Sequence, residues 1–179
     1  MSTLAAKGPS GLLHHDGEVR RRAIDQVRLH RRGLYALRQV LLTDDLAPLR
    51  ARAALRLGYA RDAVVIPWLR EALADPMASV RDAAYAAVAR VAFGHHAGAA
   101  TEDHERASAV VAALVAGACE EPLWWVRRTA VRGLTLAATS ERSAEDVALG
   151  EGVVEALHRA LEDPFWRVRY AAAQALALI

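Results

Sequence analysis

The stretch DPMASVRDAAYAAVARV, residues 75–91, decides the fold because its skeleton returns along the chain. The skeleton is an acid, four residues, then an aliphatic residue and Arg, followed at fixed spacing by Ala and a second aliphatic residue. It returns as DDLAPLRARAALRLG from Asp44, as EPLWWVRRTAVRGLTLA from Glu121 and as DPFWRVRYAAAQALALI from Asp163. A degenerate copy, HHDGEVRRRAIDQV, begins at His14. One unit therefore recurs through most of the 179 residues.

The spacing within each copy predicts an amphipathic helix. We count positions from the aliphatic residue that precedes Arg, and these anchors are Val19, Leu49, Val80, Val126 and Val168. Position +4 is Ala and position +8 is aliphatic in every copy, and positions 0, +4 and +8 share one face of an α-helix. A small residue in the middle of that face indicates that a neighbouring helix comes close. Position +1 is always Arg: Arg20, Arg50, Arg81, Arg127 and Arg169.

A second amphipathic segment lies between consecutive copies. These segments are LYALRQVLL (34–42), AVVIPWLREAL (63–73), ERASAVVAALVAGAC (105–119) and EDVALGEGVVEALHRAL (145–161). The acid at position −5 precedes Pro in three copies, and an acid-Pro pair there is typical of a helix end followed by a turn. Each repeat is therefore predicted to be two antiparallel helices. Such a pair cannot bury its apolar face alone, so the repeats must stack.

The signature D-P-x-x-x-V-R-x-x-A-x-x-A-L resembles that of HEAT-repeat proteins, of the short-repeat type also found in phycobilisome-lyase-like proteins. The match is good from Asp75, Glu121 and Asp163 and looser from Asp44. The resemblance implies an all-α, right-handed α-solenoid of about four helical hairpins plus an N-terminal half-repeat. It also implies that the Arg at position +1 is structural and pairs with the turn Asp from repeat to repeat.

We predict one HEAT-like domain over residues 14–179, preceded by a flexible tail over residues 1–13. The first residues have no continuous apolar core and do not resemble a signal peptide. The single cysteine, Cys119, cannot form an internal disulfide, and its apolar surroundings predict a small core residue. These features favour a cytoplasmic protein.

Aromatic and basic residues gather at the predicted groove of the last two repeats. Positions −2, +2 and +6 should face that groove, opposite the buried face. There the residues change from small and mixed to aromatic and Arg-rich, which is typical of protein interfaces. Alternatively, the aromatic residues fill the turn core. The candidate protein-binding residues are Trp124, Arg128, Arg132, Trp166 and Tyr170.

The charge is unevenly distributed although the net charge is only +2. Residues 1–61 hold 12 Lys and Arg against 5 Asp and Glu, whereas residues 62–179 hold 11 against 16. A basic end can bind an anionic partner or simply be solvated. The candidate nucleic-acid-binding residues are Arg21, Arg28, Arg31 and Arg32.

Catalytic motifs and ligand sites are not apparent. His95, His96 and His104 lie near Glu102 and Asp103, but their spacing matches no zinc pattern, so we expect no metal and no cofactor. Some HEAT-like proteins are enzymes, namely deoxyhypusine hydroxylases and alkylpurine DNA glycosylases. The former use several His-Glu pairs, of which this chain has one, and the latter combine Trp with a carboxylate that is missing beside Trp124. There is also no Gly-rich phosphate loop.

The sequence thus favours a non-catalytic adaptor or scaffold. It would bind a protein partner, or associate with itself, through the groove and the exposed end of its C-terminal repeats. Nucleic-acid binding through the N-terminal Arg cluster is the main alternative. A lyase-like or chaperone-like factor is a further alternative, which rests on the resemblance alone.

Overall fold

The computed structural model describes residues 9–94, 104–140 and 147–179, and within these residues the only regular elements are helices. Three short 3-10 turns, η1 (Pro9–Leu13), η2 (Ala63–Val65) and η3 (Ala72–Ala74), accompany the α-helices. The α-helices are α1 (Gly17–Gln26), α2 (Arg31–Thr43), α3 (Ala47–Leu57), α4 (Ile66–Glu71), α5 (Ala78–Phe93), α6 (His104–Glu120), α7 (Trp124–Thr139), α8 (Val147–Ala160) and α9 (Trp166–Leu176).

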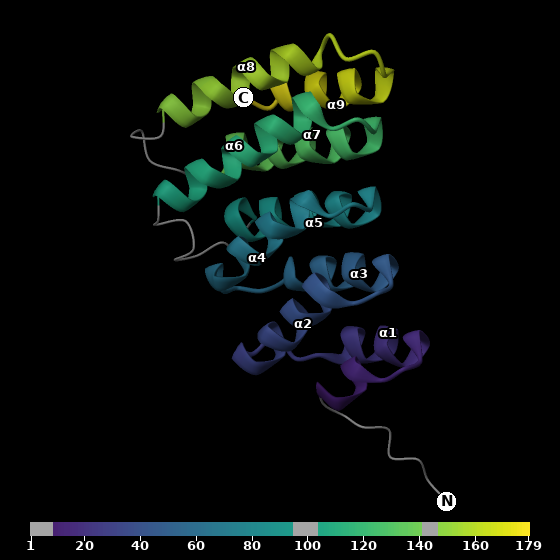
Figure 1. The fold of residues 1–179 in the computed structure, drawn as a ribbon. Coiled ribbons are helices and arrows are strands. Elements are labelled where there is room, and N and C mark those ends of the chain that lie inside the picture. The colour runs from purple at the N-terminus through teal and green to yellow at the C-terminus, as the bar shows by residue number, and fades with distance from the viewer. Residues whose placement is uncertain (1–8, 95–103, 141–146) are drawn as a thin grey trace, which may run out of the picture.

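The helices stack as hairpins in two layers (Figure 1). The hairpins pair α2 with α3, α4 with α5, α6 with α7 and α8 with α9, while α1 leads the stack as a half-repeat. The helices that begin with the repeated skeleton, α1, α3, α5, α7 and α9, pack side by side in one layer. The predicted all-α solenoid of about four hairpins is therefore confirmed.

The core follows the predicted helix face. In α5 the residues at positions 0, +4 and +8, Val80, Ala84 and Val88, have no exposed surface. The corresponding residues of α3 and α7 are also buried. In α1, by contrast, Val19 and Ala23 are only half-buried. The helix α1 is the first of its layer, so α3 packs against one side of it and no α-helix of the described chain packs against the other side.

Two elements differ in extent from the prediction. The segment 63–73 was expected to form one helix, but α4 spans only Ile66–Glu71 between two 3-10 turns. Pro67 occupies the first turn of α4. Proline is well tolerated there because an N–H in the first turn has no acceptor within the helix, so its loss breaks no helical hydrogen bond. Near the N-terminus, Leu12 of η1 is 3% exposed and packs into the core. The packed part of the chain therefore includes residues before the predicted boundary at 14.

The prediction for Cys119 is wrong. Its side chain is exposed near the C-terminal end of α6, and its neighbour Ala118 takes the buried position. Adjacent positions on a helix are about 100° apart, so an apolar stretch alone does not identify the buried residue. None of the helices in the described part of the chain is long and apolar enough to cross a membrane.

Candidate functional site

The Arg at position +1 forms a ladder that links consecutive repeats. Its guanidinium reaches the acid at the turn of the next repeat, and its Nη1 donates to backbone carbonyls of its own turn. In α7, for example, Nη1 of Arg127 donates to the carbonyl oxygens of Glu121 at 2.7 Å and Pro122 at 3.1 Å. The Nε–carboxylate distances are 2.8 Å for Arg20–Asp44, 2.8 Å for Arg50–Asp75, 2.8 Å for Arg81–Glu121 and 2.6 Å for Arg127–Asp163.

The acids of the ladder also shape the turns. Oδ1 of Asp75 accepts the backbone N–H of Met77 at 2.8 Å, directly before α5 begins. Burial raises the pKa of Asp75, but the hydrogen bonds from Arg50 and Met77 and the nearby positive charges outweigh it, so that the pKa lies below its usual value. The same balance lowers the pKa of Asp163. The ladder residues are therefore structural, as the resemblance implied.

Two tryptophans at the starts of α7 and α9 form a candidate binding surface. The guanidinium carbon of Arg167 lies 5.0 Å from the ring centroid of Trp124 and 5.3 Å from that of Trp166, within cation–π distance of both. The ring of Phe165 stacks on Trp124 with centroids 6.0 Å apart, and Arg128 lies 5.3 Å from the same indole. We call Trp124, Arg128, Phe165, Trp166 and Arg167 the aromatic–arginine surface.

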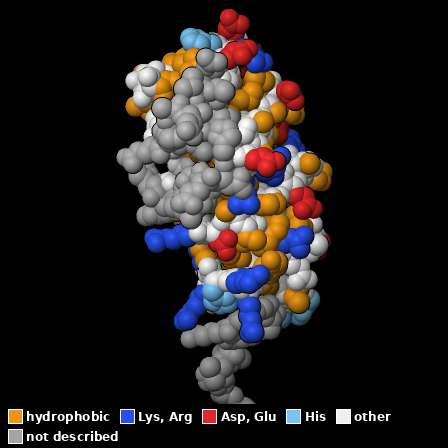
Figure 2. All heavy atoms as spheres, turned by 90° about the vertical axis from the view of Figure 1, so that its left-hand side faces the viewer, with side chains coloured by type: hydrophobic (Ala, Val, Ile, Leu, Met, Phe, Trp, Pro, Cys, Tyr) orange, Lys and Arg blue, Asp and Glu red, His pale blue; other side chains and the backbone are white. Residues whose placement is uncertain are grey.

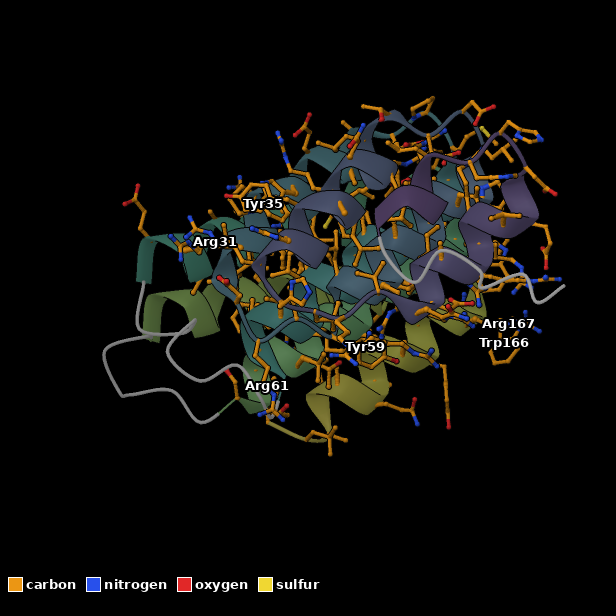
Figure 3. All side chains as sticks on the ribbon, turned by 90° about the horizontal axis from the view of Figure 1, so that it is seen from below. Arg31, Tyr35, Tyr59, Arg61, Trp166 and Arg167 are labelled. Carbon is orange, nitrogen blue, oxygen red and sulfur yellow. The ribbon has the colours of Figure 1, made fainter. Side chains whose placement is uncertain are left out.

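Most of this surface is open to solvent. Trp166 is 61% exposed and Phe165 is 47% exposed, whereas Trp124 is half-buried and packs against the core. Figure 3 shows Trp166 and Arg167 side by side, projecting from one edge of the molecule. Tyr170, one turn after Trp166, is 58% exposed, and its hydroxyl accepts a hydrogen bond from the side chain of Gln174. A large exposed area of indole and phenyl is unusual unless a partner covers it.

Three arginines of this region differ from the ladder arginines in their partners. Arg128, Arg132 and Arg167 form no ion pair with any described residue, in contrast to the fully paired Arg127. The Nε of Arg128 is buried and lacks a hydrogen-bond acceptor, which is costly for a charged group. Arg132 is exposed one turn further along α7. The surface therefore combines apolar rings with unneutralised positive charge.

The N-terminal Arg cluster is only partly available. Arg21 is held by Glu18 at 2.6 Å and lies 3.8 Å from Asp25, so its charge is neutralised locally. Arg28, Arg31 and Arg32 are exposed and form no ion pair with a described residue. Figure 2 shows the face on the left-hand side of Figure 1, and Lys and Arg side chains gather on its lower part, toward the N-terminal repeats. Three of the four candidate residues are thus free to contact an anion.

Arg167 is not among the residues predicted from the sequence, and Phe165 was expected only as a residue that fills the turn core together with Trp125. The predicted site residues stand at positions −2, +2 and +6, whereas Arg167 and Phe165 stand at positions −1 and −3. The signal that could have found them is the pair of triplets Leu-Trp-Trp (123–125) and Phe-Trp-Arg (165–167), which occupy the same positions in neighbouring repeats. Neighbouring helix starts bring these triplets together, and Arg167 bridges them.

The described residues were compared with the side-chain clusters that hold metal ions. They contain no cluster of three or more His, Cys, Asp or Glu side chains that could hold a metal ion, and His95 and His96 lie outside them. A hollow of about 420 Å³ lies beside the turns before α5 and α7. Its Arg81 and Glu121 pair with each other, while burial and the Glu121 charge raise the pKa of its Tyr85 to about 12. This phenol therefore stays protonated at neutral pH.

Comparisons with known proteins agree with the observed architecture. Residues 111–179 match the family model described as HEAT repeats. A search of curated proteins gives no match. Two engineered proteins of known crystal structure are similar with TM-scores of 0.68, at 20% and 21% identity. The similarity to the first covers 99% of this chain and 79% of the engineered protein, and the similarity to the second covers 100% and 81%.

A designed armadillo repeat protein is also similar, with a TM-score of 0.62 and 19% identity over 96% of this chain and 80% of that one. At these identities the structural similarity concerns the fold alone. The match identifies HEAT repeats over residues 111–179, and the repeated skeleton and the stacked hairpins continue the same architecture over residues 17–93.

Proposed function

We propose that this chain is a non-catalytic scaffold that binds a segment of another protein through the aromatic–arginine surface, with Arg132 and Tyr170 at its margin. HEAT-like and armadillo-like repeat folds are typically protein-interaction scaffolds. The observation that carries the proposal is the Trp124–Arg167–Trp166 stack, which holds one exposed and one half-buried indole beside arginines that pair with no described carboxylate. Trp and Arg are the residues that most often dominate the binding energy of protein interfaces.

The chemistry of the surface indicates the kind of segment that it binds. Arg128, Arg132 and Arg167, which meet no carboxylate in the described part of the chain, favour a segment that carries Asp or Glu, since charge-assisted hydrogen bonds to guanidinium are strong and directional. The exposed rings favour apolar side chains in the same segment. Because the helices that hold these residues are fixed by the ladder, the scaffold loses little conformational entropy on binding.

A pull-down with the full-length chain tests this proposal. One half of the lysate is treated with nuclease, and the Trp124→Ala/Trp166→Ala variant runs beside the parent chain. We expect a protein that is retained after nuclease treatment and whose affinity falls at least about tenfold in the double variant. Circular dichroism should show that the variant keeps its helices, because Trp166 is mostly exposed and Trp124 only half-buried.

The matched control is Tyr35→Ala. Tyr35 is also an exposed aromatic residue with one ring contact, at 5.0 Å to Trp68, and Figure 3 shows it on the opposite side of the molecule from Trp166. The Tyr35→Ala variant should bind the captured protein with the same affinity as the parent chain does. Equal loss in Tyr35→Ala and in the double variant would contradict the proposal.

The second candidate function is nucleic-acid binding at the N-terminal end. The observation that favours it is that Arg28, Arg31 and Arg32 are exposed and form no ion pair within residues 9–94, 104–140 and 147–179. In that case nuclease treatment abolishes the capture of material in the pull-down, whereas the Trp124→Ala/Trp166→Ala variant still captures it. Its affinity should also fall steeply with salt, because each phosphate contact releases counterions.

A further inference from the structure

A buried phenol faces the hollow of about 420 Å³ that lies beside the turns before α5 and α7. Tyr85 of α5 lines this hollow and is only 6% exposed. Its hydroxyl forms no hydrogen bond with any described residue, and a buried hydroxyl without a partner destabilises a fold. The hollow therefore contains a polar group whose hydrogen bonding a ligand can complete.

The hollow is particular to the junction between α5 and the hairpin of α6 and α7 (Figure 1). A Cβ at Gly117 of α6 would lie 2.6 Å from the hydroxyl oxygen of Tyr85, so the phenol fits because position 117 has no side chain. In the next repeat, α8 has Arg159 at the position of Gly117. Position +5, which is Tyr85 in α5, is apolar in every other copy of the skeleton: Ile24, Ala54, Val131 and Ala173. The repeat by itself therefore does not require the hydroxyl.

The hydrogen-bond donors of the one cation in the lining are already engaged. Nε and Nη2 of Arg81 donate to the two carboxylate oxygens of Glu121 at 2.8 Å and 3.0 Å. Nη1 of Arg81 donates to the backbone carbonyls of Asp75 at 2.9 Å and Pro76 at 3.2 Å. Glu120 also lines the hollow, is exposed, and forms no ion pair with a described residue. The groups that remain for an occupant are thus the Glu120 carboxylate and the phenol oxygen, both of which accept hydrogen bonds.

The charge of the lining favours a cation. Three carboxylates line the hollow, and they belong to Asp75, Glu120 and Glu121. Arg50 pairs with Asp75, and Arg81 pairs with Glu121, so one negative charge remains among the described residues. Burial raises the pKa of the phenol, and the charges of Glu121 and Glu120 raise it further against the effect of Arg81, so both carboxylates act at the hydroxyl. A ligand with a single positive charge would neutralise this site.

We propose that the hollow binds a protonated amine, which donates hydrogen bonds to the Glu120 carboxylate and to the hydroxyl oxygen of Tyr85. The amine belongs either to the side chain of a lysine in another protein or to a small free amine, and the two sources share this chemistry. The carboxylates alone would attract any cation weakly, whereas the buried phenol adds a fixed acceptor beside them. The site shares no residue with the aromatic–arginine surface, so it does not depend on the proposed function.

NMR titration of the ¹⁵N-labelled full-length chain tests the proposal. The two probes are N-acetyl-lysine methylamide and butylamine, which carry the same single charge on the same four-carbon chain. We expect saturable shifts of the backbone amides of Gly117 and Glu120. Glu120→Gln should weaken binding about tenfold, and Tyr85→Phe, which keeps the ring, about threefold. Tighter binding of the lysine probe assigns the site to a protein side chain, and equal binding of both probes assigns it to free amines.

Glu162→Gln is the matched control. Glu162 is exposed and directly precedes the acid of the next turn, as Glu120 does, but the matching position of α7 is Val131 instead of a tyrosine. This variant should bind both probes as the parent chain does, and so should Trp166→Ala, which removes a ring of the aromatic–arginine surface. Equal losses in Glu162→Gln and Glu120→Gln would show attraction by surface charge alone and would overturn the proposal. Binding that ignores both Glu120→Gln and Tyr85→Phe would also overturn it.

Discussion

Arg127 shows how one side chain joins two repeats. Its guanidinium is 9% exposed and its partner Asp163 is 7% exposed, so removing the arginine leaves a buried carboxylate without its countercharge. We expect Arg127→Gln to lower the free energy of unfolding by about 3 kcal/mol, because unpaired buried charges carry a penalty of that size. Urea denaturation with an unchanged slope measures the loss.

Arg169→Gln is the matched control, because Arg169 stands at the same position of α9 and donates only to the backbone carbonyls of Asp163 and Pro164. The same substitution there removes no described carboxylate contact, so its cost should stay below about 0.5 kcal/mol, as is usual for exposed positions. Similar losses at both positions would mean that the carboxylate is not what makes the inner rungs stabilising.

The ladder also predicts how stability depends on pH. The pKa values of Asp75 and Asp163 are lower in the folded protein than in the unfolded chain, so these groups stabilise the fold above their unfolded values. The stabilisation is lost as the pH falls below about 4 toward the folded values. The melting temperature should therefore drop steeply between pH 5 and pH 2 (roughly the span over which such carboxylates protonate). Asp75→Asn should flatten that drop, and an unchanged slope would contradict the account.

At the scale of the element, close packing between α5 and α6 depends on Gly117, whereas Gly152 in α8 has open space around it. A Cβ at Gly117 in α6 would lie 2.5 Å from ring atoms of the buried Tyr85, whereas a Cβ at Gly152 in α8 meets no atom within 4 Å. We expect Gly117→Ala to destabilise the protein by about 1–3 kcal/mol because the core is overpacked. Gly152→Ala should stabilise it by roughly 0.5–1 kcal/mol, since alanine favours the helix. Thermal unfolding of both variants checks the signs, and a gain in both would mean that α5 and α6 have room to separate.

The elements were predictable wherever the repeat constrains them. Positions 0, +4 and +8 determine the buried faces of α3, α5 and α7, and the acid at position −5 marks each turn. The extent of α4 was not predictable from apolar periodicity, because Pro67 decides where the α-helix starts. Apolar periodicity also failed for Cys119 on α6, because the adjacent residues Ala118 and Cys119 differ in burial although both lie in an apolar stretch.

The arrangement of the candidate site was predictable only in part, for a different reason. Matching positions place Trp124 and Trp166 on neighbouring helices, and the structure brings both within reach of Arg167. Arg167 contacts both rings because its side chain extends from α9 toward α7, and helical periodicity does not predict the direction of a side chain. The availability of Arg128 and Arg132 likewise depends on which acids lie near them, and a single sequence does not give those distances.

At the scale of the whole molecule, each hairpin packs mainly on its immediate neighbours, from α1 at one end to α9 at the other. Stability in such a stack is close to a sum of local terms, so the two ends act almost independently. The exposed Arg28, Arg31 and Arg32 lie at one end, and the aromatic–arginine surface lies at the other. Binding at one end therefore need not alter the other, and each can be tested separately.

The most direct test of the scaffold function is hydrogen–deuterium exchange of the full-length chain with and without the protein that the pull-down retains. We predict slower exchange over residues 124–132 and 166–170 in the complex, where the aromatic–arginine surface begins α7 and α9. Exchange in α1 and α2 should stay unchanged. Protection confined to residues 17–43, with α7 and α9 unaffected, would contradict the account and place the binding site at the N-terminal Arg cluster.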